Sequence, residues 1–124
     1  MLDEIKAILT DLCADEDVPM NCVYYGMCIE KKLEQWNFFT FRRLSAGLTN
    51  SQRSTIDRYE ICIVHDDYIP EGYHLTVADT LLSALPGASR DSDFEFATAL
   101  KTDSAALVEI CRFEIKKTSK VKVD

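Results

Sequence analysis

Glycine, proline and histidine are scarce in this chain, which has four glycines, three prolines and two histidines in 124 residues. The patterns G-x-G-x-x-G, G-x-x-x-x-G-K-[ST] and G-x-S-x-G do not occur. Without them, nothing supports a glycine-rich loop that cradles phosphate, or a sharp turn that presents a nucleophilic serine. The sequence therefore predicts no nucleotide cofactor and no hydrolase of that type.

Long apolar runs are also missing, because the longest fall far short of the roughly 20 residues that a membrane helix needs. Residues 1–6 lack the basic start and the apolar stretch of a signal peptide. The five cysteines are an odd number and mostly sit beside apolar residues, which is typical of free thiols in a reducing cytosol. We expect a cytoplasmic protein that does not bind a membrane.

The charge is strongly acidic, with a formal net charge of −7. This balance disfavours a dedicated nucleic-acid binder, because phosphate contacts depend on Lys and Arg. The charge is uneven: residues 11–17 are acidic, and residues 116–124 form a predicted basic tail. The lysines of that tail are Lys116, Lys117, Lys120 and Lys122. Such blocks are solvated ends or contacts with a charged partner, for instance an opposite patch on another copy.

Hydrophobic periodicity predicts one α+β domain over residues 1–124. An apolar stripe at helical spacing indicates a helix at Leu2–Leu12, and a second stripe indicates a helix at residues 77–85, with Thr76 as its N-cap. Strands are expected at residues 23–25, 36–44, 59–64, 94–97 and 110–115. Residues 45–55 are predicted to be a flexible loop. The order is α-β-β-β-α-β-β, with two helices packed on a mostly antiparallel sheet.

Catalytic chemistry has little support in the sequence. Cys62 and His65 lie an odd number of residues apart on a strand, which places them on opposite faces and disfavours a nucleophile–base pair. A metal site is the other candidate, since histidine and carboxylate suit several metals. Its residues would be His65, Asp66, Asp67 and His74. Their spacing matches no known ligand pattern, and a polar strand end and loop explains these residues better than a metal site does. Asp91 and Asp93 are interpreted as turn residues that hydrogen-bond their own backbone.

Aromatic residues crowd one predicted strand at Trp36, Phe38, Phe39 and Phe41. Alternation places apolar bulk on both faces of this strand. The strand is therefore either central in the core or covered on one face by another subunit, because exposed aromatic patches mark contacts. These four residues are the candidate subunit interface.

The element order, small size and acidic character resemble the tail terminator, or tail-completion, proteins of long-tailed bacteriophages and prophages. The resemblance covers the opening helix at Leu2–Leu12, the aromatic strand, the loop, the second helix and the final hairpin. It is a resemblance of layout. It implies a virion-assembly protein without catalytic, metal or cofactor residues. Its partners would be other copies of itself in a ring, possibly hexameric in that family, together with the tail tube and the head-completion proteins.

The resemblance also implies a location, the bacterial cytoplasm during assembly and then the virion tail. By position alone, the candidate contacts with partners lie on the loop and the tail. They are Arg53, Arg58, Lys116, Lys117, Lys120 and Lys122. Two alternatives remain open: a small metal-dependent enzyme that uses the His65 to His74 region, and an acidic inhibitor or immunity-type protein that masks a basic partner.

Overall fold

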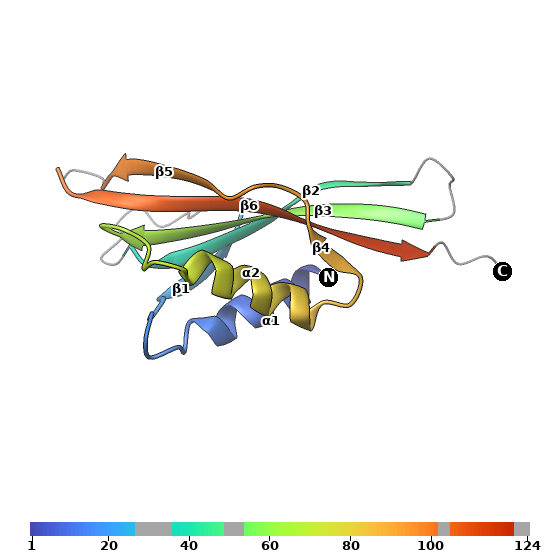
Figure 1. Ribbon diagram of the computed structural model, residues 1–124, viewed down its shortest axis with the longest axis horizontal. Coiled ribbons are helices and arrows are strands. Elements are labelled where there is room, and N and C mark those ends of the chain that lie inside the picture. Colours follow the sequence, from blue (N-terminus) through green and yellow to red (C-terminus); the bar gives the residue numbers. More distant parts are fainter. Residues whose placement is uncertain (27–35, 49–53, 102–104, 121–124) are drawn as a thin grey trace.

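A computed structural model describes residues 1–26, 36–48, 54–101 and 105–120 of the chain (Figure 1). The elements in these residues are α1 (Leu2–Leu12), β1 (Cys22–Tyr25), β2 (Phe38–Leu48), β3 (Ser54–Asp66), α2 (Tyr73–Ala84), β4 (Ala88–Arg90), β5 (Glu95–Leu100) and β6 (Leu107–Lys120). This confirms the expected α+β class, with two helices and a mostly antiparallel sheet among the described residues. Neither helix is long and apolar enough to cross a membrane.

The sheet is organised around β3 and β6. Its strand order is β1-β2-β3-β6-β4, and β5 also pairs with β6. β3 and β6 pair antiparallel along nearly their whole lengths, from Ser54↔Lys120 to Asp66↔Val108. β4 and β5 follow one another along the other edge of β6, where Arg90 lies opposite Ile115 and Glu95 lies opposite Arg112. β1 runs parallel to β2.

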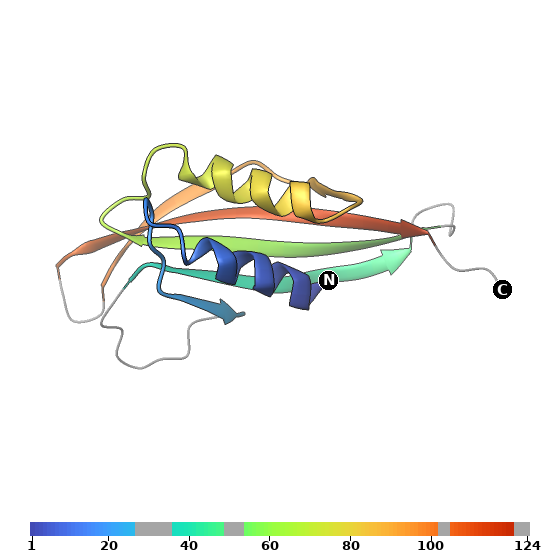
Figure 2. The same cartoon turned by 90° about the horizontal axis from the view of Figure 1, so that it is seen from below.

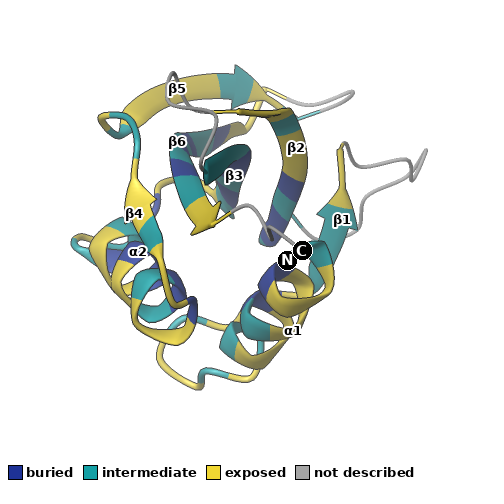
Figure 3. Cartoon of the chain, turned by 90° about the vertical axis from the view of Figure 1, so that its right-hand side faces the viewer, coloured by how far each residue is buried: buried dark blue, intermediate teal, exposed yellow. Residues whose placement is uncertain are grey.

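Both helices cover one face of the sheet (Figures 1 and 2). Ile5 and Leu9 are buried on α1 because they are four residues apart and therefore share one side of the helix. Val77 and Leu81 have the same relation on α2. The central strands meet the helices with large side chains that are fully buried, namely Phe39, Ile61, Ile63, Phe113 and Ile115. Figure 3 shows this burial concentrated on the central strands and on the facing sides of the helices.

A smaller apolar cluster lies on the opposite face of the sheet. It consists of Phe38, Val64 and Val108, with Trp36 and Tyr24 packed against it. Phe38 and Phe39 are neighbours in the chain, so they point to opposite faces of β2. Each enters a different cluster, which explains why the aromatic strand is apolar on both sides.

One end of the sheet extends beyond the helices. At this end β2, β3 and β6 run on past α1 and α2, toward the right of Figures 1 and 2. We call this extension the arm and define it by residues 45–48, 54–58 and 116–120. Within the described chain, no further strand pairs with residues 45–48 of β2 or with residues 118–120 of β6. Among the described residues, the arm therefore has an open strand edge at residues 45–48 of β2, whereas at the β6 edge the N–H of Thr118 donates to the carbonyl oxygen of Gly87 at 3.3 Å.

The arm corrects two of the sequence predictions. Ser45 to Leu48 and Ser54 to Thr55, expected in a loop, belong to β2 and β3. Lys116 to Lys120, expected in a tail, belong to β6. In both cases the segment is a strand because a distant segment pairs with it, and small polar residues do not prevent that pairing. Residues 49–53 and 121–124 lie outside the described residues.

The second helix begins earlier than its stripe predicted. It starts at Tyr73, with Gly72 at the N-cap in a left-handed conformation, and Thr76 lies inside the helix. Tyr73 is buried and stacks on Phe39, so core packing extends the helix by a turn. β4 was not predicted, because its sequence Ala88–Arg90 has no strand pattern and is held by β6 alone.

Candidate functional site

The arm gathers four of the six basic residues that the sequence suggested as partner contacts. Arg58 lies directly opposite Lys116, Asp57 opposite Lys117, and Ser54 opposite Lys120. Asp57 is the only acidic residue on the described part of the arm. Arg53 and Lys122 lie outside the described residues. The arm is therefore a basic projection on an acidic protein.

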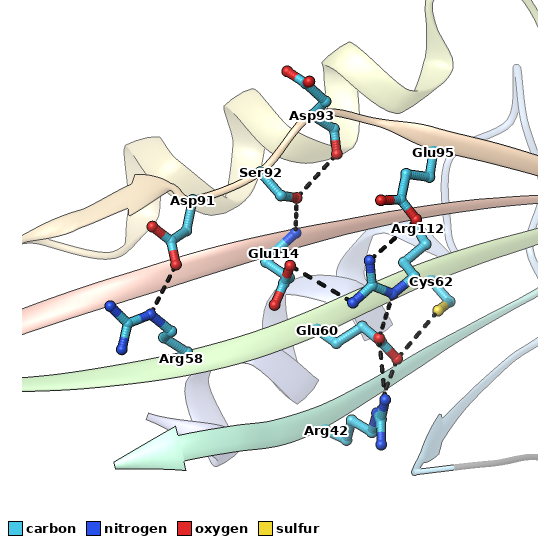
Figure 4. Close-up of polar contacts among 10 residues, drawn as sticks. All are labelled: Arg42, Arg58, Glu60, Cys62, Asp91, Ser92, Asp93, Glu95, Arg112 and Glu114. Carbon is cyan, nitrogen blue, oxygen red and sulfur yellow. Dashed lines mark hydrogen bonds and ion pairs between the residues drawn. The ribbon is translucent and has the colours of Figure 1, made fainter. Parts of the chain in front are cut away.

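Asp91 compensates the repulsion between Arg58 and Lys116. Its carboxylate accepts a hydrogen bond of 2.9 Å from Arg58 Nε and lies 3.6 Å from Lys116 Nζ (Figure 4 draws the Arg58 contact). Two like charges opposite one another on a strand pair are destabilising, and the carboxylate removes that cost. The interpretation of Asp91 as a residue bonded to its own backbone is thus wrong for its side chain, which links β4 to the base of the arm.

A second set of polar side chains lies next to the arm, on the face of the sheet that the helices do not cover. Glu60 accepts hydrogen bonds from Arg42, at 2.9 and 3.2 Å, and from Arg112 at 2.5 Å. Arg112 also reaches Glu95 at 3.3 Å and Glu114 at 3.6 Å. Figure 4 shows the side chains converging from β2, β3, β5 and β6. We call this group the polar ladder. It links four strands through Arg42, Glu60, Glu95, Arg112 and Glu114.

Glu60 is 8% exposed, so its charge has to be neutralised locally. Burial acts to raise the pKa of its carboxyl, but the hydrogen bonds and charges of Arg42 and Arg112 outweigh burial and lower the pKa below its ordinary value. Burial raises the pKa of the neighbouring Cys62 thiol, which keeps it protonated. A protonated thiol is a poor nucleophile.

The aromatic residues proposed as a subunit interface are largely used within the chain. Phe39 and Phe41 are 0% and 4% exposed in the main core, and Phe38 is 6% exposed in the smaller cluster. Trp36 is half-buried against that smaller cluster. The three phenylalanines thus leave almost no surface for a neighbour, because both faces of β2 are already covered at these positions.

The residues of the proposed metal site do not form a ligand group. His74 packs edge-on against Phe94 and Phe96, and Asp66 forms an ion pair of 2.6 Å with Lys101. His65 Nδ1 lies 2.9 Å from the carbonyl oxygen of Asp66. Among the described residues, no three His, Cys, Asp or Glu side chains are close enough to hold one metal ion. The structure therefore assigns these residues to a strand end and to a helix–strand contact.

A groove lies between the two helices, and acidic residues contribute to its lining. It has a volume of about 280 Å³. Its lining is apolar with acidic members, namely Ile8, Asp11, Leu12, Asp15, Thr80 and Ala84. Asp15 also lines a second depression of about 420 Å³, where Asp17 and Glu71 join it. We call the first of these the helix groove.

Sequence reasoning could have found part of this surface. The acidic block at residues 11–17 was visible, but the apolar floor depends on how α1 and α2 lie side by side. The roles of Glu60 and Asp91 carried no local signal, since each depends on arginines from distant strands. Comparison with protein-family models and with curated proteins gives no match for this chain.

Proposed function

We propose that this chain is a non-enzymatic structural subunit that assembles head to tail into a closed ring. In this proposal the ring caps a phage tail tube and joins it to the head, as tail terminator proteins do. The arm is the observation that carries the proposal. It is a three-stranded end of the sheet that extends beyond the protein's own helices and gathers basic residues.

A ring requires two different surfaces on each subunit, because neighbours meet through a heterologous contact that closes on itself. The arm supplies one such surface at one end of the long axis (Figure 2). Elsewhere the sheet offers free edges: in the described chain β1 pairs only with β2, and β5 only with β6. Free strand edges and a projecting arm are features that an isolated monomer has to protect and that a multi-subunit assembly uses.

The chemistry of the site fits a structural role. The buried carboxylate Glu60 is fully engaged by two arginines, and the half-buried thiol of Cys62 is held protonated. In the proposed ring the partners are further copies of this chain, the tail tube and head-completion proteins. Assembly takes place in the bacterial cytoplasm, and the product is part of the virion tail.

The test is the solution mass, measured by light scattering over a concentration series at low and moderate salt, with negative-stain electron microscopy of the largest species. We expect a discrete closed oligomer, or a monomer that passes reversibly into one, with ring-shaped particles. A single monomer mass at every concentration and both salt levels would contradict the proposal. That result would favour the acidic binding protein, which forms a tight one-to-one complex with a cationic partner.

A further inference from the structure

The helix groove and the arm have complementary properties on one molecule. The groove lies between the helices, whereas the arm begins where the helices end (Figures 1 and 2). Because the arm continues away from its own helices, it does not reach its own groove. Contact between the two surfaces therefore requires a second copy of the chain.

The acidic side chains of the groove are placed against local preference. Asp11 and Asp15 lie at and just beyond the C-terminal end of α1, whose last turn contains no basic residue. Carboxylates at this end face the negative pole of the helix, which is an unfavourable position for a negative charge. Neither residue forms an ion pair with a described residue. Asp15 Oδ1 accepts a hydrogen bond of 2.9 Å from the backbone N–H of Asp17, which gives this carboxylate a local role in the turn after α1. The carboxylate of Asp11 has no such role among the described residues, and a cationic neighbour would offset its charge.

The arm carries an apolar and a cationic group on the same face. Leu48 of β2 pairs with Thr55 of β3, and Thr55 pairs in turn with Ser119 of β6. Two residues further along the strands, Asp57 of β3 pairs with Lys117 of β6. Ser119 and Lys117 are two residues apart, so Leu48 and Lys117 share one face of the arm. Leu48 is 60% exposed. The groove offers the matching pair, an apolar floor at Leu12 and Ala84 beside the carboxylate of Asp11.

We propose that the arm of one copy docks in the helix groove of the next copy. Leu48 covers the apolar floor formed by Ile8, Leu12 and Ala84, and Lys117 meets Asp11. The contact is heterologous, so repeated copies form a ring when its rotation closes. The inference rests on the proposed self-assembly and specifies which two surfaces make the contact.

Charge exchange between Lys117 and Asp11 tests the contact. We expect Lys117→Glu and Asp11→Lys each to weaken self-association about tenfold or more, because each places like charges together. The double variant Asp11→Lys/Lys117→Glu restores the opposite pair and recovers association. Leu48→Asp weakens association as well. The readout is the dissociation constant from sedimentation velocity at low salt.

The variants have matched controls and a fold check. Lys6→Glu makes the same charge change as Lys117→Glu, at an exposed position of α1 that does not line the groove. Asp93→Lys makes the same charge change as Asp11→Lys, at an exposed position between β4 and β5. Asp11→Lys places a positive charge near the C-terminal end of α1, where it is favourable. The melting temperature of this variant should therefore stay the same or rise while its self-association weakens.

Three results are decisive. If the wild type associates but the single variants behave like their controls, the arm–groove contact is wrong and the proposed ring stands. If the double variant associates more weakly than both single variants, Lys117 does not face Asp11 and the contact is also wrong. If the wild type is monomeric under all conditions, the ring fails and this contact fails with it.

Discussion

Replacing Glu60 with Gln tests the energetic role of the polar ladder. The substitution keeps the size of the side chain and one acceptor oxygen, but it removes the charge that Arg42 and Arg112 share. It also turns a donor group toward two guanidinium groups. The side chain has 10% of its surface exposed, so water cannot replace the lost partner at Glu60 itself.

The magnitude follows from the exposure of the two arginines. Removing one partner of a fully buried ion pair costs about 3–5 kcal/mol. Here the side chains of Arg42 and Arg112 are 50% and 33% exposed, so both can regain water when the carboxylate is lost. We therefore expect Glu60→Gln to lower the free energy of unfolding by about 1–3 kcal/mol at pH 7. Urea denaturation followed by circular dichroism measures this difference.

The pH dependence gives an independent check. Because the pKa of Glu60 is lowered in the folded state, its contribution is fully present above the unfolded-state pKa and is lost as pH falls through the folded-state pKa. The difference between wild type and Glu60→Gln should stay constant from pH 7 down to the ordinary carboxyl range and shrink below it. Glu95→Gln is the matched control, because Glu95 contacts the same Arg112 with a side chain that is 67% exposed. This substitution should lower the free energy of unfolding by less than about 0.5 kcal/mol. Equal effects of the two substitutions, or a Glu60 effect that grows in acid, would refute the reasoning.

Three further predictions concern the core and the turns. Phe113→Ala removes a fully buried ring and should lower the free energy of unfolding by about 3–5 kcal/mol in urea titration, whereas a loss below 1 kcal/mol would mean that the core collapses around the gap. Gly87→Ala should lower the free energy of unfolding by about 1–3 kcal/mol in the same assay, because Gly87 has φ +80° and an added Cβ would lie 3.1 Å from the carbonyl oxygen of Thr118. An unchanged denaturation midpoint would argue against that backbone conformation. Burial raises the pKa of Cys111 to about 12, so iodoacetamide at pH 8 should leave this thiol unmodified until urea unfolds the protein, as mass spectrometry of the labelled peptides would show.

Local patterns predicted the helices better than the sheet edges. The bounds of α1 were predicted correctly because Ile5 and Leu9, with their neighbours, repeat at helical spacing and face the sheet. The start of α2 was missed, since Tyr73 is drawn into the helix by its contact with Phe39, which lies far away in the sequence. The same holds for β4, which has no strand signal and depends on β6.

The candidate site depended still more on distant pairing. Serines, threonines and a glycine made residues 45–55 look like a loop, yet the described part of this segment is strand because β3 holds β2 and β6 holds β3. Glu60 was expected on a strand, but its partners Arg42 and Arg112 come from two other strands. Charge partners across a sheet follow from register, and register is not visible in a single short segment.

The position of β6 in the sheet sets the order in which this protein can be completed during translation. β6 pairs with β3, β4 and β5, and it is made after all three. Until residues 107–120 have left the ribosome, these strands have no neighbour on that side, and the floor of the core formed by Phe113 and Ile115 is missing. Nascent chains therefore present open strand edges from the synthesis of β3 until β6 emerges, and in this interval a chaperone, or premature contact between copies, competes with folding.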